Sequence, residues 1–132
     1  MATIKSYTDI EQSKKLAEIL PLESADMYYF RQIVNDYFPP AESIYPIPLF
    51  KDGKEDFNYD IRCWSLAALL GVLPKRIKEC NVLRIDIDEK DFAIWYDEVG
   101  FRVNNDLPDI TADNPVDACY EMILKLNEQN IL

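Results

Sequence analysis

The clearest pattern of apolar and polar positions is a strict alternation between residues 83 and 103. Tight turns at Glu89-Lys90 and at Asp97-Glu98 bring every second residue of this run onto one face. The apolar residues on that face are Leu83, Ile85, Ile87, Phe92, Ile94, Tyr96, Val99, Phe101 and Val103. A period of two with one apolar face is typical of half-buried β-strands. The run therefore predicts a three-stranded antiparallel meander with strands at about 82–88, 91–97 and 99–104.

Helical spacing of apolar residues marks two segments that precede this sheet. Thr8 and Glu11 match the Ser/Thr-x-x-Glu capping box, in which each side chain accepts a backbone N–H of the other residue. They predict a helix over about 8–20. Residues 61–73 have hardly any polar face, which predicts a second helix at the buried centre of the fold.

A third helix is predicted over about 115–129, near the end of the sequence. Asn114 suits the N-cap, and Pro115 suits the first helical position. Helices packed on one face of an antiparallel sheet make a two-layer α+β fold, and 132 residues are close to the usual size of one domain. We therefore expect one α+β domain over residues 1–132, with the three helices covering one face of the meander.

The middle of the chain has no such clear period. Residues 26–38 are rich in aromatics and fit either a short helix or a strand followed by a turn. Prolines lack the N–H donor and restrict the residue before them, and four of them follow here: Pro39, Pro40, Pro46 and Pro48. Residues 39–60 are accordingly predicted to form a long irregular segment, of a length that usually has a role of its own or is disordered.

The composition is that of an acidic globular protein. Apolar residues make up 48% of the chain and charged residues 29%, and 24 acids against 14 bases give a net charge of −10. This charge repels nucleic-acid phosphates and disfavours direct nucleic-acid binding. The sequence has no signal-peptide pattern and no apolar run of membrane-spanning length. Its three scattered cysteines fit reduced thiols, so we expect a cytoplasmic protein that does not bind membranes.

The carboxylates within the predicted sheet are the first candidates for chemistry. Asp86 and Asp88 form an Asp-x-Asp pair, and with Asp91 they are candidate ligands of a divalent cation. The calcium-loop pattern fails, however, because its sixth position is Asp91 where glycine is needed, and its twelfth is Asp97 where glutamate is needed. We favour the interpretation that these acids lie on the solvated face and at the turns of the sheet.

The predicted register supplies partners for the charges on that outer face. Asp86 lies beside Ala93, which leaves room for an ion pair between Asp86 and Arg102 on the third strand. Arg84 faces Trp95 in cation–π geometry. Exposed pairs of this kind contribute only about 0.2–1 kcal/mol each, so their role is register and solubility.

Enzymatic signatures are missing from the sequence. The chain has no histidine, which excludes Ser-His and Cys-His arrangements. Its three glycines form neither a P-loop nor a dinucleotide-binding fingerprint. We therefore expect no enzyme, no catalytic residue and no cofactor, with Ser-Lys or paired-carboxylate chemistry as the enzymatic alternative.

The segment SIYPIPLF, residues 43–50, is a candidate interaction surface because it combines apolar side chains with extended geometry. Tyr45, Ile47, Leu49 and Phe50 are its candidate contact residues, and Arg84, Trp95 and Arg102 on the sheet are further candidates. The alternative, which we favour, is that Tyr45, Ile47 and Leu49 anchor the segment to the core.

Four stretches together resemble a known group of proteins. The stretches are SYTDIEQSKKLAEILPLESADM, CWSLAALLGVLP, LRIDIDEKDFAIWYDEVGFRV and DNPVDACYEMILKLNEQNIL. They are similar to a family of short acidic hypothetical proteins of gut anaerobic bacteria and their phage-like or mobile DNA. The likeness covers most of the chain except about 28–61, and the end of the chain is more loosely similar to phage ABA sandwich domains. The resemblance implies a bacterial accessory protein of mobile DNA and supplies no catalytic residue or ligand.

Three hypotheses about function follow. The first is a non-enzymatic interaction module that binds a protein partner or self-associates. The second is an acidic mimic of nucleic acid that inhibits a DNA-binding host protein, because residues 84–117 carry a net charge of −7. The third is a metal-binding protein or enzyme that uses carboxylates.

Overall fold

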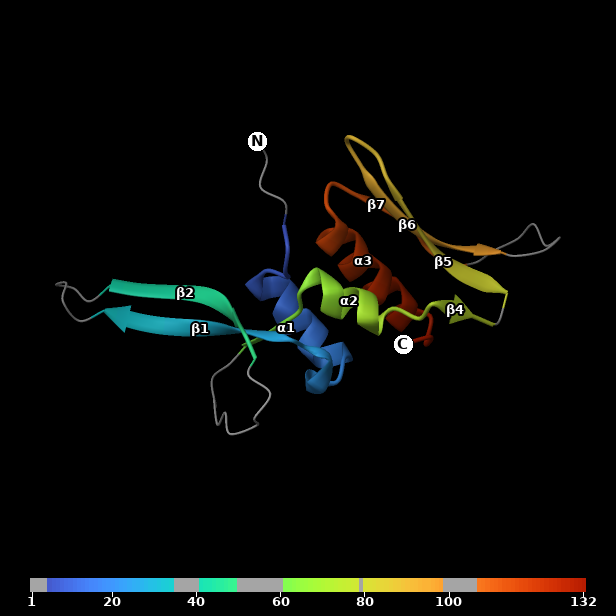
Figure 1. Ribbon diagram of the computed structural model, residues 1–132. Helices are drawn as coiled ribbons and strands as arrows, with labels where there is room; N and C mark the ends of the chain where they lie inside the picture. Colours follow the sequence, from blue (N-terminus) through green and yellow to red (C-terminus); the bar gives the residue numbers. More distant parts are fainter. Residues whose placement is uncertain (1–4, 35–40, 50–60, 79, 99–106) are drawn as a thin grey trace.

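The computed structural model describes residues 5–34, 41–49, 61–78, 80–98 and 107–132. Within these ranges the strands form two antiparallel sheets, one of strand order β2-β1-β3 and one of order β4-β5-β6-β7 (Figure 1). The α+β class predicted from the sequence is therefore confirmed. The elements in chain order are α1 (Ile10–Ile19), the short 3₁₀ helix η1 (Leu22–Ser24), β1 (Met27–Val34), β2 (Ala41–Pro48), β3 (Ile61–Cys63), α2 (Leu66–Val72), β4 (Arg76–Ile77), β5 (Asn81–Ile87), β6 (Phe92–Glu98), β7 (Asp109–Ala112) and α3 (Pro115–Glu128).

The first helix is present, but its capping box lies one residue later than predicted. Asp9 is the N-cap of α1, and its Oδ1 accepts the Gln12 N–H at 2.8 Å. Gln12 Oε1 in turn accepts the Asp9 N–H at 3.1 Å. The expected cap, Thr8, is instead fully buried, and its hydroxyl accepts the backbone N–H of Trp64 at 3.1 Å. A tertiary contact has thus taken the side chain that the local motif would have used.

The predicted irregular segment over 39–60 is wrong for residues 41–48, which form β2 along the whole length of β1. Pro46 and Pro48 fit into β2 because it is an edge strand. They lie two residues apart and so turn their nitrogens in the same direction, whereas the N–H of Leu49 donates to the Asp26 carbonyl beside β1 at 3.0 Å. Both missing donors therefore face away from β1. Residues 50–60 lie outside the described part of the chain.

The prediction of one helix over 61–73 is also partly wrong. Residues 61–63 form β3, which pairs with Met27, Tyr28 and Tyr29 of β1. The helix α2 begins only after Ser65, whose hydroxyl accepts the Ala68 N–H at 3.2 Å. Within α2 only Leu69 is fully buried, so α2 is a half-buried helix at the side of the core.

The first two strands of the predicted meander are confirmed together with their register. Leu83 pairs with Tyr96, Ile85 with Ile94 and Ile87 with Phe92 across β5 and β6. The short strand β4 pairs with the first two residues of β5, Asn81 and Val82, and β7 pairs with β6 on the opposite side of the sheet. The predicted third strand, 99–104, lies outside the described residues.

The central element of the core is α3. Asn114 caps this helix and Pro115 is its first residue, as predicted. In Figure 1, α3 lies between the second sheet and α2, and it contacts β6, β7 and α2. Six of its residues are buried: Val116, Ala118, Cys119, Met122, Ile123 and Leu126.

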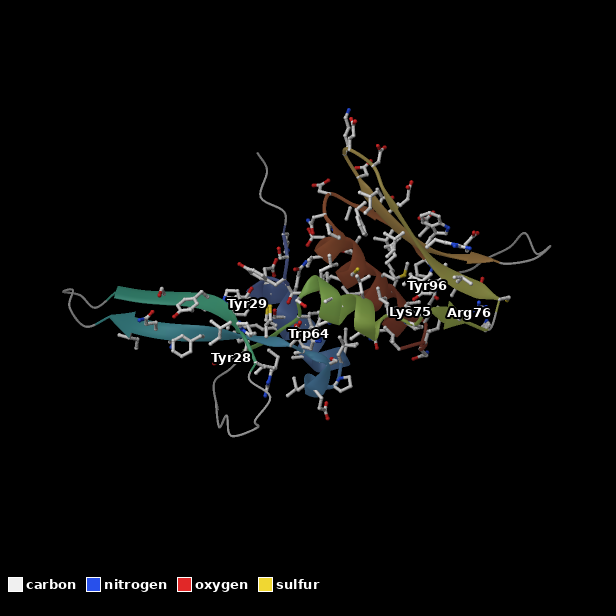
Figure 2. The ribbon with its side chains drawn as sticks, in the orientation of Figure 1. Tyr28, Tyr29, Trp64, Lys75, Arg76 and Tyr96 are labelled. Carbon is white, nitrogen blue, oxygen red and sulfur yellow. The ribbon has the colours of Figure 1, made fainter. Side chains whose placement is uncertain are left out.

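Trp64 joins the first sheet to this core from the short link between β3 and α2. Its side chain is fully buried, and its Nε1 donates to Ser24 Oγ at 2.9 Å. It belongs to the same apolar cluster as residues of α1, α2, α3 and the second sheet, and Figure 2 shows it in the middle of the molecule.

Candidate interaction surfaces

The hairpin formed by β1 and β2 extends well beyond β3. Among the described residues, β3 pairs only with Met27–Tyr29, whereas β2 follows β1 as far as Val34. We call residues 30–34 and 41–45 the arm. Figure 1 shows it projecting away from the three helices.

Both faces of the arm carry apolar side chains. On one face Ile33 and Ile44 are 56% and 44% exposed. On the other face the rings of Phe30 and Tyr45 lie 5.7 Å apart between centroids, and Tyr45 is 39% exposed. An isolated two-stranded ribbon is at best marginally stable in water, and exposed apolar clusters of this kind are typical of interaction sites.

A recess of about 490 Å³ lies beside the arm at Ile61, the first residue of β3. Its lining is mostly apolar and comprises Tyr29, Phe30, Arg31, Ile33, Ile44 and Ile61. The arm contains two charged residues of opposite sign, Arg31 and Glu42. The arm is therefore a weakly charged surface on a strongly acidic protein.

The structure separates the candidate residues of the segment SIYPIPLF. Tyr45 is exposed on the arm, whereas Ile47 faces the buried Tyr28 and is only partly exposed. Leu49 lines a groove beside η1 and α2. Phe50 lies outside the described residues. The sequence analysis did not name Ile33 as a contact residue. The signal that could have found it is the alternative in which residues 26–38 form a strand, because Ile33 is then an apolar residue of that strand.

The outer face of the second sheet agrees only partly with the predicted pairs. Arg84 does face Trp95, as predicted, and its Nε lies 3.8 Å from Asp97 Oδ2, which makes an ion pair. The expectation that Arg102 lies beyond Ala93 is wrong, because the residue opposite Ala93 on the next strand is Thr111 of β7. Arg102 itself lies outside the described residues.

The candidate metal ligands Asp86, Asp88 and Asp91 are all exposed around the turn between β5 and β6. In the described ranges, no three Asp, Glu or Cys side chains are grouped so that they could hold a metal ion. The N–H of Asp88 donates to the Asp91 carbonyl at 2.9 Å, which closes the turn. The described geometry therefore places Asp86 on the outer face of β5 and Asp88 and Asp91 at the turn, all three exposed to solvent.

Comparison with known proteins gives no match among family models, curated proteins or solved structures. The geometry of the described residues is thus the basis for any functional inference.

Cys63 and Cys119 are poor nucleophiles in this fold. All three are free thiols, and Cys63 and Cys119 are buried. Burial raises the pKa of Cys119 to about 11, although Lys75 opposes the shift, and burial also raises the pKa of Cys63. Because the thiolate is the reactive form, neither side chain is activated for nucleophilic attack. Cys119 belongs to the apolar core, and the Cys63 thiol donates to the Thr8 carbonyl at 3.4 Å. None of the helices in the described ranges combines the length and the apolar character needed to cross a membrane.

A polar cluster around Asp117 connects the N-terminal segment, α1 and α3. Asp117 Oδ1 accepts hydrogen bonds from Lys5 Nζ and Gln12 Nε2, both at 2.8 Å, and Oδ2 accepts one from Asn114 Nδ2 at 2.8 Å. Partial burial alone would raise the pKa of Asp117, but the three donors outweigh that effect and lower the pKa. Burial likewise opposes the charge of Lys5, yet Asp117 and Asp9 raise the Lys5 pKa.

Asp117→Asn is expected to make the protein less stable at neutral pH but not in acid. Because the Asp117 side chain is 36% exposed and solvent screens it, we expect a loss of only about 0.5–1 kcal/mol at pH 7. The pKa of Asp117 is lower in the folded state, so its contribution is present above the unfolded value of about 3.9 and is lost as the pH falls through the folded value. The difference between the two proteins should therefore shrink below about pH 4.

Urea unfolding followed by circular dichroism between pH 7 and pH 2 measures this difference. Asp113→Asn is the matched control, because Asp113 is exposed and lies just before the N-cap of the same helix. We expect this control to change stability by less than about 0.5 kcal/mol. A difference for Asp117→Asn that stayed constant down to pH 2 would show that the charge of Asp117 does not contribute.

Proposed function

We propose that this protein is a non-enzymatic interaction module whose contact surface is the arm. The observation that carries the proposal is the exposure of Ile33, Ile44 and Tyr45 on a two-stranded ribbon that no other described element covers. A ribbon with apolar groups on both faces is stabilised when a second surface removes those groups from water. The accessory role in phage-like or mobile DNA rests on sequence resemblance, and inhibition of a DNA-binding protein stays a prediction.

The occupant of the arm is a second copy of the same chain. A net charge of −10 makes two copies repel each other wherever their acidic surfaces approach. The arm contains one base, Arg31, and one acid, Glu42, so it has no net charge, and it projects away from the helices. Two arms can therefore meet while the acidic bodies stay apart. A contact between identical arms is self-complementary around a two-fold axis, which is the commonest symmetry of soluble dimers.

The double substitution Ile33→Ser/Ile44→Ser is expected to convert a concentration-dependent dimer into a monomer. Both side chains are about half exposed, so we expect the free energy of unfolding of the monomer to change by less than about 1 kcal/mol for the pair. Sedimentation velocity over a series of concentrations, with light scattering after size exclusion, measures the mass directly.

Leu22→Ser is the matched control because Leu22 is 48% exposed on η1, away from the arm. We expect this variant to dimerise like the parent protein. A parent protein that sediments as a monomer at every concentration overturns self-association. A dimer that survives the double substitution overturns the role of the arm.

A further inference from the structure

The strand β5 has an open edge over its second half. β4 pairs only with Asn81 and Val82, and the N–H of Leu83 donates to the Lys75 carbonyl at 3.0 Å. Beyond that point, no strand within the described ranges lies beside residues 84–87 on this side. Among the described residues, the edge is therefore open for about the length of a short peptide contact.

The backbone groups that face this edge belong to Ile85 and Ile87. Leu83 bonds toward β4, whereas Asp88 bonds toward β6 through its N–H and the Asp91 carbonyl. Hydrogen-bonding direction alternates along a strand, so the odd-numbered residues of β5 direct their N–H and C=O groups away from β6. Ile85 and Ile87 thus present two donors and two acceptors to the open edge.

The side chains of the same two residues form an uncovered apolar surface. Ile85 is 40% exposed and Ile87 is 75% exposed. Their partners across β6, Ile94 and Phe92, are 0% and 8% exposed. α3 packs on β6 and β7, so the apolar face of the sheet continues past the helix onto the end of β5.

The charges around this edge are mostly negative. Asp86, Asp88, Glu89 and Asp91 are all exposed there. Arg84, the one base within the second half of β5, is already paired with Asp97. A strand laid along β5 would place its outward side chains beside Asp86 and its inward side chains over Ile85 and Ile87.

We propose that the second half of β5 binds an extended basic segment of a partner protein by strand addition. Main-chain hydrogen bonds to Ile85 and Ile87 supply the contact, apolar side chains of the segment cover the two isoleucines, and its lysine or arginine side chains pair with the acids. This site is separate from the arm, and Figure 1 shows the two on opposite sides of the helices.

A second copy of the chain does not fit this edge. If two copies paired antiparallel along this edge, the odd-numbered residues that bond outward would have to face each other. Two of the resulting registers place Asp86 opposite Asp86 or Asp88 of the other copy, which is repulsive. The register that pairs Arg84 with Asp86 would put the other copy's Ile87 opposite Leu83, where Lys75 already bonds. The acids therefore select against self-association at β5 and in favour of a basic strand.

β2, an edge strand of the first sheet, provides a contrast. Pro46 and Pro48 remove two donors from the outer side of β2, and edge prolines of this kind disfavour the addition of a further strand along that half of β2. β5 contains no proline. The edge at β5 is therefore open to strand addition in a way that the proline-containing half of β2 is not.

Fluorescence anisotropy with a short labelled peptide in which lysine and valine alternate tests the proposal. We expect saturable binding, with at least about tenfold weaker binding of the peptide in which glutamate replaces lysine. A peptide of equal charge with proline at every second position should also bind at least about tenfold more weakly, because it cannot donate to the edge. Equal binding of the proline peptide would mean that the contact is only electrostatic and would overturn strand addition.

Ile87→Pro locates the site on the protein. The Ile87 N–H points to the open edge, so this substitution removes an edge donor without removing a bond between β5 and β6, and we expect it to abolish peptide binding. Ile33→Ser in the arm is the matched control and should bind the peptide like the parent protein.

Slower hydrogen exchange of the Ile85 and Ile87 amides when the peptide is bound is an independent measurement on the unaltered chain. Unchanged exchange at both amides, or no binding by the parent protein, overturns the proposal and leaves the arm untouched.

Discussion

Trp64→Ala is expected to lower the free energy of unfolding by about 3–5 kcal/mol, the range for truncating a buried tryptophan. Trp64 is fully buried and belongs to the apolar cluster that connects α1, α2, α3 and the second sheet. The substitution leaves a cavity at the point where β3 leads into α2. Because small proteins are stable by only about 5–15 kcal/mol in total, this one change removes a large part of the stability.

Urea unfolding followed by far-ultraviolet circular dichroism measures the loss. Ser24→Ala is the matched control, because it removes the hydrogen-bond partner of Trp64 Nε1 but keeps the ring. We expect it to lower stability by about 1 kcal/mol. A loss below about 1.5 kcal/mol for Trp64→Ala would contradict a central packing role for the ring.

The sequence alone was sufficient for the pairing of β5 with β6. A one-residue slip of either strand would turn its apolar residues to the other face, and a two-residue turn at Glu89-Lys90 selects one of the registers that keep the faces matched. The structure has that register, with Ile85 opposite Ile94. Alternation does not say how far the covering helix reaches, however, and the exposure of Ile85 and Ile87 depends on where α3 lies.

The first sheet was harder to predict because its main feature is not local. Proline opposes regular structure in general, but Pro46 and Pro48 are acceptable in β2 because β2 is at an edge and both nitrogens face outward. Whether a strand is at an edge depends on the whole sheet. The same limit applies to the arm, because the exposure of Ile33 depends on β3 ending at its pairing with Tyr29.

The segment 61–73 shows a different limit. Its apolar residues predicted one buried helix, yet residues 61–63 are held as a strand by β1. Short apolar runs fit strands and buried helices equally well. The Ser65 cap was the local signal for the true start of α2, but it stands within an apolar run that looked continuous.

Thr8→Val is expected to lower the free energy of unfolding by about 2–4 kcal/mol, although it preserves the shape of the side chain. Thr8 is fully buried, and its Oγ1 lies 2.8 Å from Ser13 Oγ and accepts the Trp64 N–H at 3.1 Å. Valine fills the same space but accepts no hydrogen bond, so the Trp64 N–H and the Ser13 hydroxyl both lose a buried partner. Urea unfolding measures the loss, and faster hydrogen exchange of the Trp64 amide identifies its origin.

Two further variants separate the hydroxyl of Thr8 from its methyl group and from its partner. Thr8→Ser keeps the hydroxyl and is expected to lose only about 1 kcal/mol, the contribution of one buried methyl group. Ser13→Ala removes the hydroxyl that faces Thr8, and in the double variant Thr8→Val/Ser13→Ala one of the unpaired groups is gone. We therefore expect the double variant to be more stable than the sum of the two single losses predicts, by about 0.5–1.5 kcal/mol.

Strictly additive losses would mean that the two hydroxyls do not act as a pair, and an equal loss for Thr8→Ser and Thr8→Val would assign the effect to packing. In either case the hydrogen bonds of Thr8 would not be what holds α1 against β3. The expected pattern would show that they are.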